Sequence, residues 1–171
     1  MSTNASAVLK PKAHNEEFDI GLKAAYRKEM SKSLSDILAA TYRLTIKSHV
    51  YHWNVVGPLF KPLHELTEEH YNTLFSATDI IAERIRALGH LAPASIGNAS
   101  DFAPGAADVD STSAIAMVND LIAEHEATAR LMRTAAGKAG DSDDMVTEDM
   151  LTARLTFHEK ALWMLRAIVS A

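Results

Sequence analysis

The apolar residues of this 171-residue chain recur with the period of an α-helix in four long segments, and no segment shows the alternation of a β-strand. Glycine, proline and short polar side chains punctuate the segments, as they do at helix ends. The first predicted helix runs from about Ser31 to His52, and the second from about Leu63 to Leu88. The third begins at Ser111, Thr112 or Ser113 and ends near Gly137 or Gly140. The fourth begins within Asp141 to Asp144 and ends near Ile168. The pattern therefore predicts an all-α fold.

The connections between these helices differ in length, and this difference indicates the topology. Only a tight turn at Gly57 separates the first two helices, so they should be antiparallel neighbours. Residues 89–112 contain two prolines and several glycines and are long enough to cross a bundle. Two short connections and a long central one are typical of a ferritin-like four-helix bundle with a crossover between helices 2 and 3. We expect a flexible N-terminal tail over residues 1–18 and one bundle domain over residues 19–171.

The composition narrows the expected partners and chemistry. The formal net charge of −5 gives no overall attraction to nucleic acid or to an acidic membrane surface. Cysteine is absent, which excludes disulfides, a thiolate nucleophile and Cys-ligated zinc. No apolar run approaches the ~20 residues that cross a bilayer, and residues 1–18 lack the apolar core of a signal peptide. A soluble cytoplasmic protein with no membrane partner is expected.

Four side chains of metal-ligating type share one face of the second helix. His64 and Glu68 are four residues apart, as are Asp79 and Glu83. All four fall within an arc of roughly 100°. The core stripe of the helix lies on a different face and runs through Leu63, Leu66, Leu74 and Ile81. An interface explains the apolar patch between them better than exposure to water does. The patch residues are Tyr71, Phe75 and Ala82. On the third helix, by contrast, the residues expected to face inward are Ile115, Val118, Leu121, Ile122 and Leu131.

Helix geometry separates the two ligand pairs. Glu68 and Asp79 lie about 16 Å apart along the helix axis, so one metal centre cannot use both pairs of one chain. The midpoint between positions 64 and 83 is nevertheless the same as the midpoint between positions 68 and 79, and it lies between residues 73 and 74. If two copies of the helix cross antiparallel at a two-fold axis there, His64 and Glu68 of one copy meet Asp79 and Glu83 of the other. We infer a metal site divided between two subunits.

His52 adds a ligand from the end of the first helix. Two imidazoles with three carboxylates suit iron, manganese or zinc. The usual di-iron site inside a ferritin bundle needs Glu-x-x-His on two helices, and no histidine here has a glutamate three residues before it. The common ferritin-type centre is therefore not expected.

Ordinary structural interpretations stand beside these functional ones. Acidic pairs at i, i+4 usually form a solvated helix face, and a single histidine on an apolar stripe is usually a core residue. Taken alone, Trp53 and Trp163 are core aromatics, and the acidic run from Asp141 to Asp149 is a helix N-terminus. The role of His49, one turn before His52, is left open. The histidines interpreted as core residues are His70, His125 and His158.

Several short motifs along the first two helices share their residue types and spacings with a known family. They are Tyr51-His52-Trp53-Asn54-Val55 with Gly57 and Phe60, Leu63-His64-Glu65, Asp79-Ile80-Ile81-Ala82-Glu83-Arg84, and Leu88-Gly89. These motifs resemble the Dps family, the DNA-binding proteins from starved cells. The resemblance extends over all four helices and excludes the N-terminal tail.

The resemblance implies a function and an assembly. It implies a hollow dodecamer that oxidises iron(II) with hydrogen peroxide or oxygen, stores the product as a ferric mineral and protects DNA from oxidative damage. It also implies a di-iron ferroxidase centre at the subunit interface. His52, His64 and Glu68 come from one subunit of that centre and Asp79 and Glu83 from its two-fold mate.

Three further implications concern single positions. Glu68 stands where many members of the family have aspartate, which keeps the ligand type and changes its reach. Trp53 lies beside the centre and takes up oxidising equivalents. Asp144 and Asp149 match acidic positions that line a three-fold pore for iron.

DNA contact rests on the tail, where Lys10 and Lys12 are the only lysines or arginines among the first fourteen residues. Twelve copies of this tail bind DNA by avidity in this interpretation. The alternative function is a nucleoid-binding, DNA-compacting protein whose metal site is vestigial or structural. A further alternative is a bundle that binds zinc or manganese without turnover.

Overall fold

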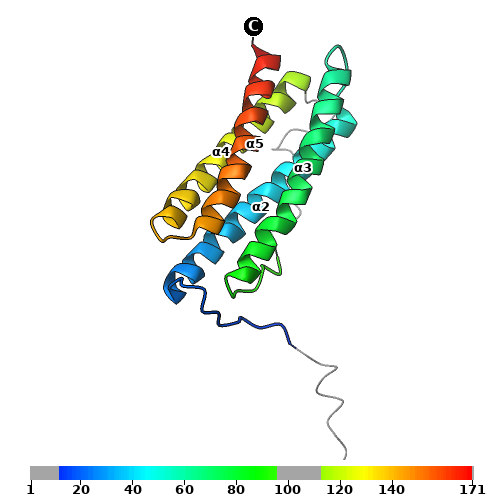
Figure 1. The fold of residues 1–171 in the computed structure, drawn as a ribbon. Coiled ribbons are helices and arrows are strands. Elements are labelled where there is room, and N and C mark those ends of the chain that lie inside the picture. The colour runs from blue at the N-terminus through cyan, green and yellow to red at the C-terminus, as the bar shows by residue number, and fades with distance from the viewer. Residues whose placement is uncertain (1–11, 96–112, 171) are drawn as a thin grey trace, which may run out of the picture.

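The computed structural model describes residues 12–95 and 113–170, which form four long helices and no strand. In chain order these are α2 (Ala24–Asn54), α3 (Phe60–Ala87), α4 (Ala114–Gly140) and α5 (Met145–Val169). Figure 1 shows that α2 and α3 form one antiparallel hairpin and that α4 and α5 form a second, packed against the first. The predicted all-α four-helix bundle is confirmed.

The two hairpins are joined by a crossover. α3 ends at one end of the bundle and α4 begins at the opposite end, so both run in the same direction (Figure 1). The connection therefore crosses the length of the bundle, as predicted, although residues 96–112 lie outside the described part. Gly89 begins it with a φ of +88°, and a Cβ there would lie 2.3 Å from the carbonyl oxygen of Glu16. Only glycine satisfies both conditions.

The predicted starts of α4 and α5 agree with the structure, and α3 begins at Phe60, three residues before the predicted Leu63. Ser113 is the N-cap of α4 and accepts a hydrogen bond from the amide of Ala116 at 3.2 Å. Asp144 is the N-cap of α5. The first helix begins at Ala24 and not at the predicted Ser31. The added turns contain good helix formers and bury Met30, which stabilises them.

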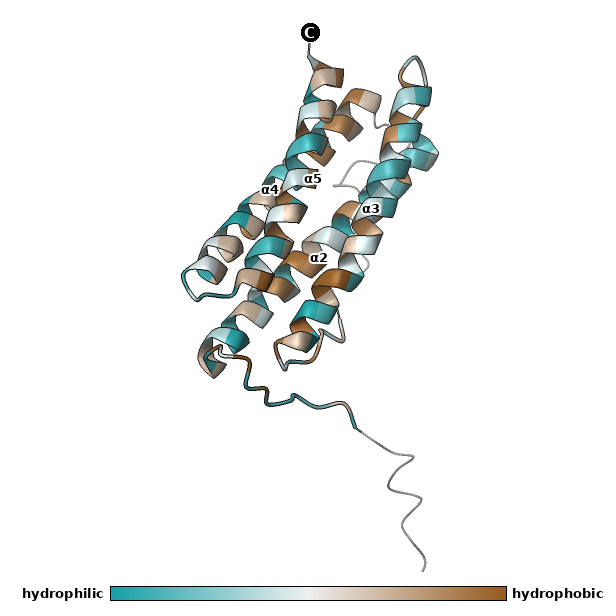
Figure 2. Cartoon of the chain, viewed as in Figure 1, coloured by the Kyte–Doolittle hydropathy of each residue, from teal (hydrophilic) through white to brown (hydrophobic). Residues whose placement is uncertain are grey.

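The core consists of two apolar clusters, one toward each end of the bundle. In Figure 2 the hydrophobic residues of each helix lie mainly on the face that turns toward the other helices. On α2, α3 and α5 the apolar residues that recur with the helical period along one stripe are buried or partly buried. On α4 the prediction was wrong for Ile115 and Leu131, which are 43% and 44% exposed. Met117 and Met132 occupy the inward positions instead, so the inner face of α4 is rotated from the predicted stripe.

A polar layer separates the two apolar clusters on α4 and α5. His125, Thr128 and His158 are fully buried there, and His70 of α3 is 2% exposed. The interpretation of the three histidines as core residues is confirmed. The two tryptophans are not core residues, because Trp53 is 62% and Trp163 is 69% exposed in the single chain.

The residues before α2 contact the end of α3. The Glu16 amide donates to the Gly89 carbonyl at 2.8 Å, and the Glu16 carboxylate pairs with Arg86. Residues 1–11 of the predicted tail lie outside the described part, and its boundary at residue 18 stays a prediction. None of the helices in the described ranges is both long and apolar enough to cross a membrane.

Candidate metal centre

His52 and His64 lie against each other across the turn between α2 and α3. The turn contains Gly57 with a φ of +86°, which lets α3 fold back along α2. The two imidazole rings are stacked, with centroids 3.7 Å apart. The Nδ1–H of His52 donates to the carbonyl oxygen of His64, and the Nδ1–H of His64 donates to the carbonyl oxygen of His52, both at 2.8 Å. Each ring is therefore fixed by the backbone of the other helix.

These hydrogen bonds decide which nitrogen of each ring is free. A carbonyl oxygen only accepts, so each Nδ1 must carry the proton. In the neutral ring the lone pair then lies on Nε2, which is the arrangement of a metal-ligating histidine whose other nitrogen donates to a carbonyl. The turn thus presents two oriented Nε2 donors.

The expected carboxylate ligands lie further along α3. Glu68 is exposed one turn after His64, and the Tyr71 hydroxyl is 3.5 Å from its Oε1. Asp79 and Glu83 are also exposed, but they lie about 16 Å and about 22 Å beyond Glu68 along the helix. Within the described ranges of a single chain, no three histidine or acidic side chains gather closely enough to hold a metal ion. The chain brings His52, His64 and Glu68 to one region and leaves Asp79 and Glu83 in another.

Apolar side chains surround the second region. Phe75 is 61% and Ile80 is 50% exposed in the single chain. A hollow of about 420 Å³ lies beside them and is lined by Tyr42, Phe75, Ser76, Thr78, Asp79 and Ala82. Exposed apolar residues grouped around a hollow are typical of an interface.

An aromatic group lies next to the histidine pair. The His49 ring lies between Trp53 and Tyr71, with centroid distances of 4.1 Å and 4.3 Å. Tyr71 also meets the His52 ring edge-on at 5.4 Å. His49 thus packs against aromatic rings beside the candidate ligands. The contact of Tyr71 with Glu68 was not predicted, although their i, i+3 spacing on one helix was a signal for it.

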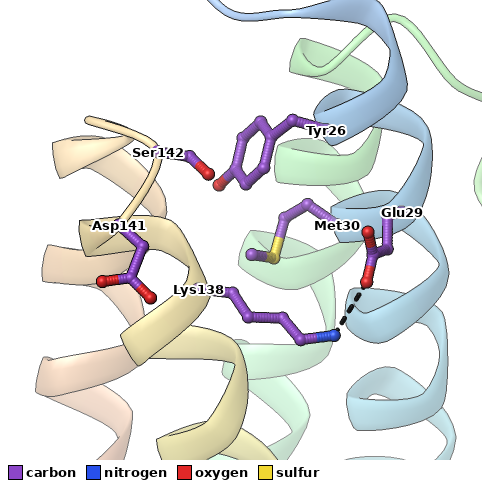
Figure 3. Close-up of a pocket in the computed structure, with 6 residues that line it drawn as sticks. All are labelled: Tyr26, Glu29, Met30, Lys138, Asp141 and Ser142. Carbon is purple, nitrogen blue, oxygen red and sulfur yellow. Dashed lines mark hydrogen bonds and ion pairs between the residues drawn. The ribbon is translucent and has the colours of Figure 1, made fainter.

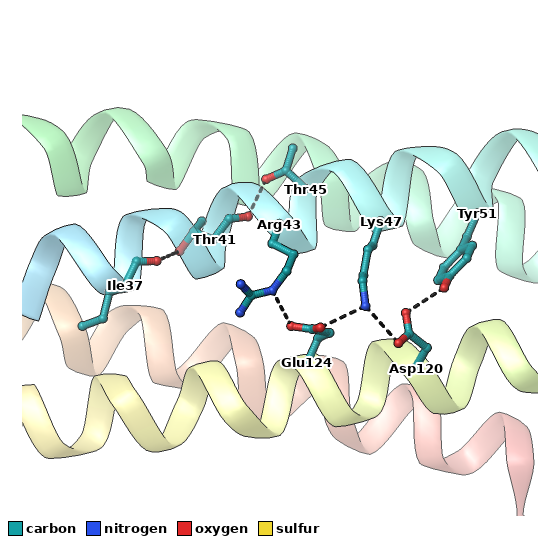
Figure 4. A network of polar contacts seen from close by, with 8 residues as sticks. All are labelled: Ile37, Thr41, Arg43, Thr45, Lys47, Tyr51, Asp120 and Glu124. Atoms are coloured by element: carbon teal, nitrogen blue, oxygen red, sulfur yellow. Dashed lines mark hydrogen bonds and ion pairs between the residues drawn. The ribbon is translucent and has the colours of Figure 1, made fainter. Parts of the chain in front are cut away.

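A buried charge network joins α2 to α4 just before His52 (Figure 4). Lys47 is 4% exposed and donates to Asp120 and Glu124, both at 2.9 Å. The Tyr51 hydroxyl donates to Asp120 at 2.7 Å, and burial together with this carboxylate raises the pKa of Tyr51. Arg43 completes the network through Glu124. The network anchors the turn of α2 that carries His52, and sequence reasoning missed it because its bonded partners lie 69 to 81 residues apart.

Asp144 does not have the surroundings of a pore residue. It is 2% exposed, and its carboxylate accepts from Arg84 at 2.7 Å, from the Tyr26 hydroxyl at 2.9 Å and from Thr147. Burial alone would raise the pKa of Asp144, but these hydrogen bonds outweigh burial and lower the pKa. Its carboxylate is occupied inside the bundle of the single chain, which favours a structural role, and the assignment of Asp144 to a pore stays a prediction. Asp149 is exposed.

A second hollow, of about 240 Å³, lies at the other end of α2 (Figure 3). Its lining residues are Tyr26, Glu29, Met30, Lys138, Asp141 and Ser142. Lys138 and Glu29 form an ion pair across it at 2.8 Å. Its lining residues on α2 lie 22 to 26 positions before His52, which separates the hollow from the candidate centre by roughly 35 Å along the helix.

Comparison with known proteins identifies the fold and the family. The ferritin-like domain family matches residues 31–171. This match, together with a four-helix bundle whose two hairpins are joined by a long crossover, defines the class of the fold as ferritin-like.

Within that class, the chain is similar to several known proteins over most of its length. The chain is 39% identical to a low temperature-induced protein of Nostoc sp. over 88% of this chain and 86% of that protein. It is 32% identical to DNA protection during starvation protein 2 of Bacillus anthracis over 84% of this chain and 98% of that protein. The crystal structure of a Dps protein from Bacillus brevis superposes with a TM-score of 0.77 at 30% identity, over 87% of this chain and 100% of that chain. The chain belongs to the Dps family.

Proposed function

We propose that the protein is a ferroxidase that oxidises iron(II) at a centre shared by two copies of the chain, with hydrogen peroxide or oxygen as acceptor. The observation that carries this proposal is the reciprocal bonding of His52 and His64, because it leaves two fixed Nε2 donors one helical turn before Glu68. The ferric product is stored inside a hollow dodecamer, in agreement with membership of the ferritin-like class.

The separation of the ligands supports a divided centre. Asp79 and Glu83 are exposed and too far from Glu68 to share its metal within one chain. The apolar residues and the hollow beside Asp79 give a second copy a surface on which to pack. Antiparallel pairing of two α3 helices then places His52, His64 and Glu68 of one copy opposite Asp79 and Glu83 of the other.

The ligand set explains how the centre handles its substrate. Three carboxylates close together repel one another, and binding of iron(II) relieves that repulsion. Neutral imidazoles complete the coordination without adding charge. Two iron(II) ions give one electron each, and one hydrogen peroxide takes both electrons and two protons to form two waters. Paired transfer avoids the release of a hydroxyl radical.

Other residues have supporting roles in this proposal. Trp53 is exposed beside the His49 ring and supplies an electron when a one-electron oxidant forms. Asp149, at the exposed start of α5, lines the route of iron into the shell. DNA protection, named for the Bacillus anthracis relative, is extended to this chain through Lys10 and Lys12 of the tail. Lys12 is exposed, and Lys10 lies outside the described residues. The protein then acts in the cytoplasm, at the nucleoid.

Complementation between two inactive variants tests the divided centre. One variant carries His52→Ala, His64→Ala and Glu68→Gln, and the other carries Asp79→Asn and Glu83→Gln. Each should assemble and fail to oxidise iron rapidly. In a random equal mixture half of the two-fold pairs are mixed, and each mixed pair has one intact site of two. Mixed shells should therefore recover about a quarter of the wild-type initial rate of ferric absorbance.

The matched control is a variant with all five substitutions mixed with the wild type, in which mixed pairs contain no intact site. Its rate should also be about a quarter of wild type, because only pairs of two wild-type chains are active. Verified mixed shells of the two inactive variants with no activity above either parent would refute the divided centre.

A further inference from the structure

His125 of α4 and His158 of α5 form a buried pair that the proposed function does not use. Both side chains are 0% exposed, and their Nδ1 atoms are 2.9 Å apart. His70 of α3 meets the His125 ring edge-on at 5.5 Å, so the pair lies where the second hairpin packs on the first. Phe157 contacts all three rings and completes the layer.

The pair is held by one proton between two Nδ1 atoms. When both rings are neutral, one Nδ1 donates and the other accepts. The Nε2 atoms of both rings are buried without a partner among the described residues. When both rings are protonated, both Nδ1 atoms become donors, so the hydrogen bond is replaced by contact between two cations.

The surroundings of the pair do not neutralise an added charge. On α5 the Arg154 guanidinium lies 5.0 Å from the centre of the Phe157 ring. The positive charge of Lys160, also on α5, adds to burial in lowering the pKa of His70 on α3. On α2 the charged side chains that face α4, Arg43 and Lys47, are already paired with acidic residues of α4 (Figure 4). No carboxylate in the described ranges bonds to either ring of the pair.

Burial is the largest cause of the resulting pKa values. It lowers the pKa of His158 to about 3, with Arg154 and His70 adding to the effect. It also holds the pKa of His125 well below the ordinary value, with His158 and His70 adding to the effect. Both rings are therefore neutral in the folded protein at pH 7.

We propose that the His125–His158 pair is an acid-sensitive switch that joins α4 to α5 within the second hairpin when neutral and forces these two helices apart when protonated. In the unfolded chain a histidine binds its proton near pH 6.5, whereas the folded pair resists protonation. The stabilisation is complete above pH 6.5 and is lost as the pH falls from there toward the folded pKa values. For each histidine the unfolding equilibrium constant rises about tenfold per pH unit over this window.

The test compares urea unfolding at pH 7.5 and pH 5.0. For the wild type the pair should raise the unfolding constant about 1000-fold between these pH values, or about 30-fold for each histidine. His158→Gln keeps a hydrogen-bonding side chain that does not titrate, so its pH dependence should be about 30-fold smaller than that of the wild type. The exposed His14→Gln is the matched control and should behave as the wild type does.

A measurement on the unmodified assembly covers the case in which the variant does not fold. Deuterium exchange at the histidine C2 position, followed by mass spectrometry, reports the protonation of each ring. His125 and His158 should show no protonation step between pH 8 and pH 5. Steps at pH 6 or above for both rings would overturn the proposal. So would a folded His158→Gln protein that loses as much stability in acid as the wild type.

Discussion

Asp144 offers a direct choice between a structural role inside the bundle and a role in iron transport. Its side chain is 1% exposed, and it is the N-cap of α5 as well as the partner of Arg84, whose side chain is 11% exposed. Asp144→Ala removes the cap, worth about 1 kcal/mol. It also leaves the Arg84 guanidinium buried without its carboxylate, and breaking such a pair costs about 3–5 kcal/mol.

The two losses come from one carboxylate and are not fully additive, so a destabilisation of about 4 kcal/mol is expected. With a urea m-value of about 2 kcal/mol/M for a chain of this size, the unfolding midpoint should fall by about 2 M. Asp144→Asn keeps a cap acceptor and should lose less. Asp141→Ala, at an exposed position on the same turn, is the control and should change stability by less than about 0.5 kcal/mol. An Asp144→Ala protein with the wild-type midpoint and slower iron uptake would refute the structural role.

Two further predictions follow from the candidate site and from the tail. His52→Ala combined with His64→Ala should abolish rapid iron oxidation and leave helix content and assembly unchanged, because neither ring belongs to the apolar core. An unchanged initial rate of ferric absorbance in this variant would exclude the two histidines as iron ligands. Lys10→Gln combined with Lys12→Gln should weaken retardation of DNA in a gel and reduce its dependence on salt. Binding of DNA by the variant releases fewer counterions, because each lost lysine leaves one phosphate without its contact. Retardation that persists at high salt in this variant would locate DNA binding on another surface.

Periodicity was sufficient to predict most of the fold. Leu74 and Ile81 of α3 lie on the predicted stripe and are fully buried. The start of α2 and the exposure of Ile115 were not predicted, because neither end of a helix is determined by the period of its middle. Lys47 was beyond prediction for another reason. A lysine inside a helix is usually exposed, and its burial depends on two carboxylates contributed by another helix.

The candidate site was predictable only as a set of residue types. Spacing identified His64, Glu68, Asp79 and Glu83 as one face of α3, and their exposure agrees with that interpretation except that His64 is half-buried against His52. The reciprocal bonds between the two imidazoles depend on the geometry of the turn, which no periodicity contains. In the same way, His125 and His158 could each be interpreted as a core residue, whereas their pairing depends on the register of α4 against α5.

The crossover between α3 and α4 divides the chain into two modules with separate tasks. All five proposed iron ligands lie on α2 and α3, and α4 and α5 supply none of them. Contacts within each hairpin are local in sequence, whereas docking of the hairpins requires closure of the long connection, whose entropy cost rises only slowly with its length. The ligand set can therefore change through substitutions in the first hairpin while the second keeps its packing, and the connection can lengthen or shorten at little cost to either module.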